Sequence, residues 1–200
     1  MLGGGLERIA EGAYLLYGEG FCSNIYVLLD EGRALLIDSG SGSSIPRLDL
    51  LSDYQIDRVL LTHGHADHIN GMNYISADGY LHKYDRDALG NLNSFIRNYS
   101  PPNNIDELDF ERYRFGRFDL EIIHTPGHTQ GSISILERTE GLLFTGDTLF
   151  AGGDVGRTDL YGGSKAMLRE SIKKLQALKF RKLCPGHGQP ELVSHGLPVI

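Results

Sequence analysis

Residues 58–68 of this chain read Arg-Val-Leu-Leu-Thr-His-Gly-His-Ala-Asp-His, an apolar run that leads directly into three histidines and one aspartate. The run 58–62 is predicted to be a buried β-strand. Imidazole and carboxylate groups suit zinc and comparable divalent ions. Because this spacing fits neither one face of a helix nor one face of a strand, we expect a loop at the strand end that turns the four side chains toward two nearby metal ions. A solvated polar loop is the alternative interpretation.

Each of three later segments places one residue of a metal-binding type beside glycine, just after an apolar run. They are 125–129 with His128, 145–148 with Asp147, and 184–188 with His187. Taken singly each pattern is weak, since a loop histidine is more often a surface or core residue and Gly-Asp is a common turn. All three segments follow a predicted strand, as residues 63–68 do, so we interpret the four segments as parts of one site.

The rest of the sequence divides into two blocks of predicted strands, each followed by helical segments. Strands are predicted over residues 13–17, 24–30, 33–38, 58–62, 80–82, 113–115, 120–124, 132–136, 142–145 and 182–184. Helices are predicted over 45–54, around 72–77, from 85 or 86, and after Ser164, where Leu168, Ile172, Leu175 and Leu178 share a face. Residues 100–106 and 151–163 are predicted loops. We expect two sheets packed face to face with helices outside, in one domain spanning residues 1–200.

Composition narrows the function classes. The 19 lysines and arginines against 26 aspartates and glutamates give a net charge of −7, which disfavours nucleic-acid binding. No stretch approaches the ~18 apolar residues of a membrane helix, and the N-terminus lacks the layout of a signal peptide. We therefore expect a cytoplasmic protein that binds no membrane, with Cys22 and Cys184 as buried, reduced thiols.

The ordered set His-X-His-X-Asp-His, then His, Asp and His, resembles the metallo-β-lactamase superfamily, and most closely its glyoxalase II-like hydrolase branch. The resemblance implies an α+β fold, a four-layer αββα sandwich with metals in a cleft at one edge of the two sheets. It also implies two divalent metal ions per chain, zinc first and iron or manganese as alternatives. Position by position, the implied ligands are His63, His65 and His128 for the first metal, Asp67, His68 and His187 for the second, and Asp147 as the bridge.

The same resemblance predicts a binuclear metal-dependent hydrolase of a small thioester or ester. A hydroxide held between two ions about 3.5–4 Å apart would attack the carbonyl carbon. Asp67, besides ligating, would orient this hydroxide and accept its proton. The alternatives are a mononuclear iron oxidoreductase of the persulfide dioxygenase type, and a lactonase or phosphodiesterase of the same fold.

The glycine-rich loop 151–163 should border the cleft, and there Arg157 and Tyr161 are predicted substrate contacts. Asp159 stands where the resemblance predicts an aromatic residue, so a salt bridge from Arg157 to Asp154 or Asp159 is the alternative role. Full-length glyoxalase II adds a C-terminal helical domain, whereas 13 residues follow His187 here. The resemblance therefore does not identify the thiol that carries the acyl group of the substrate. His82 and His124 are expected to pack in the fold, although His124 could line the cleft.

Overall fold

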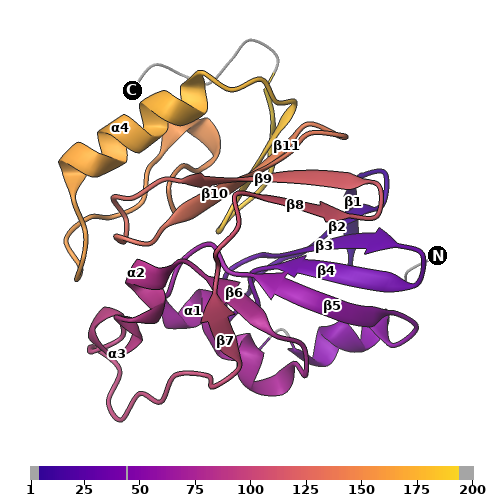
Figure 1. The fold of residues 1–200 in the computed structure, drawn as a ribbon, viewed down its shortest axis with the longest axis horizontal. Coiled ribbons are helices and arrows are strands. Elements are labelled where there is room, and N and C mark those ends of the chain that lie inside the picture. Colours follow the sequence, from indigo (N-terminus) through magenta and orange to yellow (C-terminus); the bar gives the residue numbers. More distant parts are fainter. Residues whose placement is uncertain (1–4, 44, 194–200) are drawn as a thin grey trace.

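The computed structural model describes residues 5–43 and 45–193, and two β-sheets lie face to face at its centre (Figure 1). The first sheet consists, in spatial order, of β1 Glu7–Ala10, β2 Ala13–Leu16, β3 Ile25–Asp30, β4 Arg33–Ile37, β5 Gln55–Leu60, β6 Gly79–Leu81 and β7 Ile105–Glu107. Its strands are antiparallel from β1 to β4 and parallel from β4 to β7. Parallel neighbours need crossover connections, which here carry the short helices of the chain.

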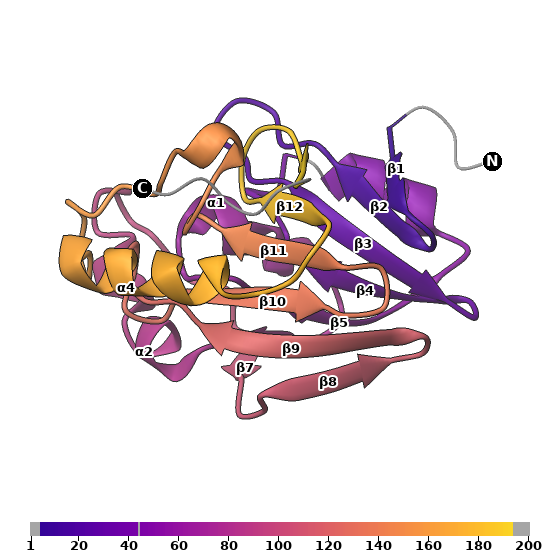
Figure 2. The same cartoon turned by 90° about the horizontal axis from the view of Figure 1, so that it is seen from above.

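The second sheet follows in sequence. Its strands are β8 Arg112–Phe115, β9 Phe118–His124, β10 Ile133–Glu137, β11 Leu142–Gly146, β12 Lys182–Pro185 and β13 Glu191–Leu192. Neighbours are antiparallel except β11 and β12, which are parallel and joined through a helix. That helix, α4 Lys165–Gln176, lies along the outer face of this sheet (Figure 2).

The remaining helices are short and cover the outer face of the first sheet (Figure 1). They are α1 Ala66–Ile69, α2 Lys83–Arg86, α3 Leu89–Leu92 and the 3₁₀ helices η1 Ile45–Leu51 and η2 Asn70–Tyr74. A third 3₁₀ turn, η3 Ala151–Gly153, follows the second sheet. Helices, sheet, sheet and helix make the expected four-layer αββα sandwich.

Alternate side chains of the central strands bury into two different cores. In β4, Leu35 and Ile37 point between the sheets, whereas Ala34 and Leu36 pack against the outer helices. This is the period of a strand covered on both faces, and it explains why these strands are continuous apolar runs. The core between the sheets contains the large buried rings of Phe115, Phe118 and Phe144, and a third core packs the second sheet against α4.

Several expected elements are present and others differ. Ser164 caps α4, where its hydroxyl accepts a hydrogen bond from the Met167 amide, and Leu178 lies beyond the helix end. The segment 45–54 is a 3₁₀ helix that ends at Leu51, and the predicted loop 100–106 contains the start of β7. Strands β1, β7 and β13 are short and partly exposed, so the sequence carries little apolar pattern for them.

Cys22 and Cys184 are both buried and no disulfide joins them, as expected. No helix within the described ranges has the length and apolar character needed to span a bilayer.

Candidate metal centre

Four strand ends deliver the predicted ligands to one edge of the sandwich. Strand β5 ends at Leu60, three residues before His63, while β9, β11 and β12 end at His124, Gly146 and Pro185. The backbone amide of Ile133 donates a hydrogen bond to the carbonyl of Thr62 at 2.8 Å, which ties the two sheets together at this edge. The sequence motif 63–68 begins as a loop and then enters α1 at Ala66, so Asp67 and His68 lie in one helical turn.

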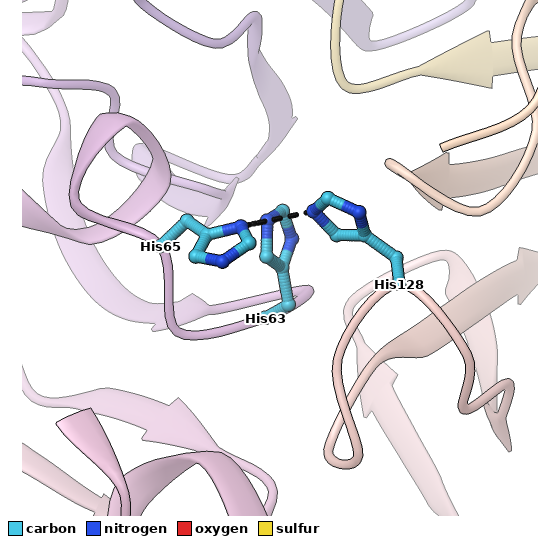
Figure 3. A group of neighbouring side chains, drawn as sticks. All are labelled: His63, His65 and His128. Carbon is cyan, nitrogen blue, oxygen red and sulfur yellow. Dashed lines mark hydrogen bonds between the residues drawn. The ribbon is translucent and has the colours of Figure 1, made fainter. Parts of the chain in front are cut away.

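The first group of converging side chains comprises His63, His65 and His128, which are 1%, 5% and 3% exposed. Figure 3 shows the rings turned toward one another. The His65 Nδ1 atom lies 3.1 Å from His63 Nε2 and 2.9 Å from His128 Nε2. One ligand atom from each ring falls within 4.8 Å of the others, which is a spacing that a single ion can serve.

The second group comprises Asp67, His68 and His187, whose ligand atoms also lie within 4.8 Å of one another. His187 Nε2 is 3.2 Å from Asp67 Oδ2, and both side chains are about one third exposed, at 32% and 31%. His68, by contrast, is fully buried.

Asp147 lies between the two groups. Its carboxylate oxygens are 3.3 Å from His68 Nε2, 3.6 Å from His187 Nε2 and 3.7 Å from His128 Nε2. The next strand end leaves room for this carboxylate only because residue 186 is glycine, where a Cβ would stand 2.4 Å from Asp147 Oδ1. A single carboxylate thus faces imidazoles of both groups.

Some buried polar atoms of these side chains lack a hydrogen-bond partner, which indicates whether the set suits a metal ion. The buried atoms His68 Nε2 and Asp147 Oδ1 have no hydrogen-bond partner, a costly state inside a protein. His128 Nδ1 lies 2.8 Å from the Arg157 carbonyl and donates to it, so the neutral ring presents a lone pair at Nε2, toward His65. Lone pairs that face one another are satisfied by a cation. The residues present therefore fit divalent metal ions.

Burial and neighbouring charges hold His63, His65 and Asp147 in the protonation states that metal ligands require, whereas His68 must lose a proton before it can bind a metal. Burial first, and then the neighbouring imidazoles, lower the pKa of His63 well below its usual value and that of His65 to about 4. Burial alone would raise the pKa of Asp147, but His68 and His128 lower it well below its usual range. Burial would lower the pKa of His68, but the carboxylates of Asp147, Asp38 and Asp67 raise it well above its usual value.

A buried aspartate that the sequence analysis missed orients His68. Asp38 follows β4 with a left-handed φ of 61° and is 2% exposed. It accepts hydrogen bonds from His68 Nδ1 at 2.8 Å, from the Thr62 amide at 2.7 Å and from the Thr62 hydroxyl at 2.8 Å. A carboxylate on the far nitrogen of a ligating histidine fixes the ring and raises its basicity. The signal for Asp38 was its place directly after an apolar run, as for the other four segments.

The sequence analysis also missed Asp85 and Asn93. These two residues lie in or next to the short helices α2 and α3 and hold the backbone of the motif 63–68. The Asp85 carboxylate accepts from the Gly64 amide at 2.8 Å, the Gly131 amide at 2.6 Å and the Thr129 hydroxyl at 2.7 Å. Asn93 accepts from the Ala66 amide and donates to the Gly64 carbonyl, at 2.8 and 2.9 Å. Burial raises the pKa of Asp85, and these three hydrogen bonds oppose that effect. Both loops that carry the first group are therefore held by one carboxylate.

The loop of His187 is held from the first sheet. Asn24 Nδ2 donates to the carbonyls of Pro185 at 3.1 Å and Gly188 at 2.8 Å, and the Tyr26 hydroxyl also donates to the Pro185 carbonyl. The amide of Asn24 donates to the carbonyl of Gly186 at 2.7 Å. The more exposed group is thus fixed at its backbone even though its side chains reach solvent.

A cleft of about 650 Å³ opens over these residues. Its described lining outside the predicted ligands consists of Gly20, Phe21, Ser41, Ala66, Asn70, Phe95, Ile96, Arg157 and Leu160. Phe21 and Phe95 are 94% and 65% exposed, so two unburied aromatic rings stand at the mouth.

The two predicted substrate contacts are placed differently. Arg157 lines the cleft, but its guanidinium binds the Asp159 carboxylate through two contacts of 2.8 and 2.7 Å, the alternative role weighed above. Tyr161 is not among the lining residues; it is exposed, and its hydroxyl accepts a hydrogen bond from Asn91 at 3.4 Å. His82 and His124 stack on each other with ring centroids 4.3 Å apart and do not line the cleft.

An αββα sandwich whose strand ends gather five histidines and two aspartates at one edge defines a class of metal-dependent enzymes. Residues 18–187 match the family model described as the metallo-beta-lactamase superfamily. The chain belongs to this superfamily.

Two curated relatives are similar in sequence. A probable metallo-hydrolase of Methanocaldococcus jannaschii, MJ0888, is 35% identical over 192 residues, covering 87% of this chain and 91% of that protein. A hydroxyacylglutathione hydrolase of Aeromonas salmonicida is 34% identical over 162 residues, covering 77% of this chain but 56% of that enzyme. The chain is therefore a metallo-hydrolase of the superfamily.

Three solved structures have the same fold. The B3 metallo-beta-lactamase BLEG-1 has a TM-score of 0.76 at 29% identity, covering 90% of this chain and 93% of that chain. TTHA1623 in a di-iron-bound form has a TM-score of 0.72 at 26% identity, covering 89% and 93%. ETHE1 from Myxococcus xanthus has a TM-score of 0.66 at 26% identity, covering 88% and 75%.

Proposed function

We propose that this chain hydrolyses a thioester with two divalent metal ions. In this proposal His63, His65 and His128 would hold the first ion, Asp67, His68 and His187 would hold the second, and Asp147 would serve both. The observation that carries the proposal is the Asp147 carboxylate, which lies 3.3–3.7 Å from imidazoles of both groups. When bound, the ions would supply an ionised water at neutral pH and polarise the substrate carbonyl.

The side chains have separable roles in this proposal. The three neutral imidazoles of the first group add no charge, and Asp67 and Asp147 supply two negative charges that partly neutralise the ions. Asp67 lines the cleft with its carboxylate about one third exposed, so it can accept the proton released from the attacking water. The carbonyl carbon gains a bond to oxygen and loses its bond to sulfur, and the departing thiolate takes up a proton from solvent.

The cleft favours a thiol over an alcohol or amine as the leaving group. Apart from the predicted ligands, Arg157 is the sole titratable side chain among the described residues that line it. An arginine stays protonated and is no proton donor. A thiolate, whose thiol has a pKa of about 8.5, can leave without an acid, whereas an alkoxide or an amine leaving group needs one. The hydroxyacylglutathione hydrolase relative, whose name describes a thioester substrate, supports the same class.

Zinc is the proposed metal, with iron and manganese as alternatives. Ligand sets of nitrogen and oxygen accept all three ions, and supply decides among them. One structural neighbour holds two irons.

The test is a hydrolysis screen with metal content measured on the same sample. One acyl group is presented on glutathione, coenzyme A and N-acetylcysteamine, and as an oxygen ester, a lactone and a β-lactam. We expect about two metal ions per chain and hydrolysis of the thioesters at least about 100-fold faster, by kcat/KM, than the matched oxygen ester, a difference of ~2.7 kcal/mol in activation free energy. Faster turnover of the lactone or β-lactam would contradict the proposed substrate class.

The same sample tests the oxidoreductase alternative. Oxygen uptake is measured with glutathione persulfide as substrate. One iron per chain together with oxygen consumption would replace the hydrolase proposal by the mononuclear iron oxidoreductase.

A further inference from the structure

A second hollow of about 700 Å³ lies beside the cleft, between the loop 155–159 and helix α4. We call it the α4 groove. Its described lining consists of Val155, Gly156, Arg157, Thr158, Asp159, Lys165, Leu168, Arg169, Ile172, Lys173 and Gln176. It is not part of the predicted metal centre, because none of the seven predicted ligands lines it.

Arg157 connects the two hollows. Its residue lines both the cleft and the α4 groove, and its backbone carbonyl accepts the hydrogen bond from His128 Nδ1 at 2.8 Å. The loop between the hollows is therefore fixed to the metal centre. A molecule that places its reacting group at the metals can extend past Arg157 into the groove.

The helix side of the α4 groove carries a row of cations. Lys165, Arg169 and Lys173 follow one another at intervals of four residues, so they share one face of α4 with a rise of about 6 Å per step. Lys173 pairs with the exposed Glu170 at 2.8 Å. Across the groove, Asp159 is already bound by Arg157.

The floor of the groove is apolar. Leu168 and Ile172 are 4% and 6% exposed and belong to the buried face of α4, while Val155 at the rim is 39% exposed. A basic row above an apolar floor suits a ligand with phosphate groups on an organic body. The row also contrasts with the net charge of −7 of the whole chain, so the cations are gathered locally.

We propose that the α4 groove binds the phosphate-bearing end of a nucleotide-type thiol carrier, whose thioester reaches the metals past Arg157. This proposal rests on the proposed thioesterase function. Three cations spread over about 12 Å of helix match phosphates spaced along an extended chain, and a hollow this size lies within the roughly 300–1,000 Å³ that organic ligands occupy. A short peptide thiol with two carboxylates would leave at least one cation of the row unpaired.

The test compares two double variants with equal charge change. Arg169→Glu with Lys173→Glu reverses the row, and both side chains are exposed, so the fold is expected to persist. The control is Lys174→Glu with Lys179→Glu, two exposed lysines nearby that do not line the groove. Metal-loaded protein is assayed with one acyl group on coenzyme A, glutathione and N-acetylcysteamine.

We expect the row reversal to raise KM for the coenzyme A thioester by about tenfold with kcat unchanged. KM for the uncharged N-acetylcysteamine thioester should change less than twofold, and the control variant should change neither substrate by more than about twofold. An equal KM rise for the N-acetylcysteamine or glutathione thioester, or an equal effect of the control, would overturn the proposal.

Calorimetric binding of desulfo-coenzyme A separates this proposal from the function on which it rests. This probe lacks the thiol and needs no turnover. If no thioester is hydrolysed, the proposed function fails, yet binding that the row reversal weakens about tenfold would still support the groove. Absence of binding to the parent protein, or binding that the row reversal leaves unchanged, would refute it.

Discussion

The two groups of predicted ligands share Asp147 but differ in their surroundings. The first group, His63, His65 and His128, is almost wholly buried and carries no charge of its own. The second group pairs a buried histidine with Asp67 and His187, which are about one third exposed. Asp67 and His187 line the cleft with about a third of each side chain exposed, whereas His65 and His128 line it with only 5% and 3% exposed. We infer from this difference that the first ion is held more firmly and that the second exchanges more readily.

The largest effect is expected where the two groups meet. Asp147→Asn keeps the shape of the side chain but removes the charge that faces both sets of imidazoles. We expect kcat/KM to fall by about 1000-fold or more, because several kcal/mol of charge stabilisation are lost. Metal content should fall toward one ion per chain. Full activity with both ions bound would show that Asp147 does not bridge them.

The next variants separate the groups from one another. His187→Asn should leave about one ion per chain, held by the buried group, while His128→Asn should lose more metal because its partners are then incomplete. Loss of one ligating histidine should weaken its ion by at least about 100-fold. Metal analysis after dialysis against a weak chelator measures both. Greater retention by the His128 variant would reverse the proposed order.

A smaller effect is expected from the support of the buried group. The Asp85 carboxylate accepts hydrogen bonds from the Gly64 and Gly131 amides and the Thr129 hydroxyl. Asp85→Asn would place an amide donor against these three donors. Unfolding in urea should show a loss of about 2–4 kcal/mol. The matched control is Asp87→Asn, an exposed carboxylate next to the same helix, which should change the free energy of unfolding by less than about 0.5 kcal/mol. An equal decrease in the free energy of unfolding for both variants would show that the buried hydrogen bonds of Asp85 do not stabilise the fold.

The gathering of the seven residues could be predicted from the sequence because each follows an apolar strand, and strand ends on one edge of a sandwich meet. The contacts that support these residues could not be predicted. No pattern around Asp85 in the sequence distinguishes it from other residues of a short helix, and only the folded chain places it against Gly64 and Gly131. The role of Arg157 could not be predicted either. One residue lies between Arg157 and Asp159, and whether the guanidinium binds that carboxylate or a substrate depends on side-chain rotamers that sequence spacing does not determine.

The division of the ligands between the sheets has a kinetic consequence. The motif 63–68 belongs to the first sheet, while His128, Asp147 and His187 follow strands of the second, so neither sheet alone presents a full set. Ions bound by residues of both sheets would stabilise the chain only after the two sheets have packed together, which is late on the folding pathway. Metal loading should therefore lengthen the lifetime of the native state by slowing unfolding, while the rate of folding stays nearly unchanged.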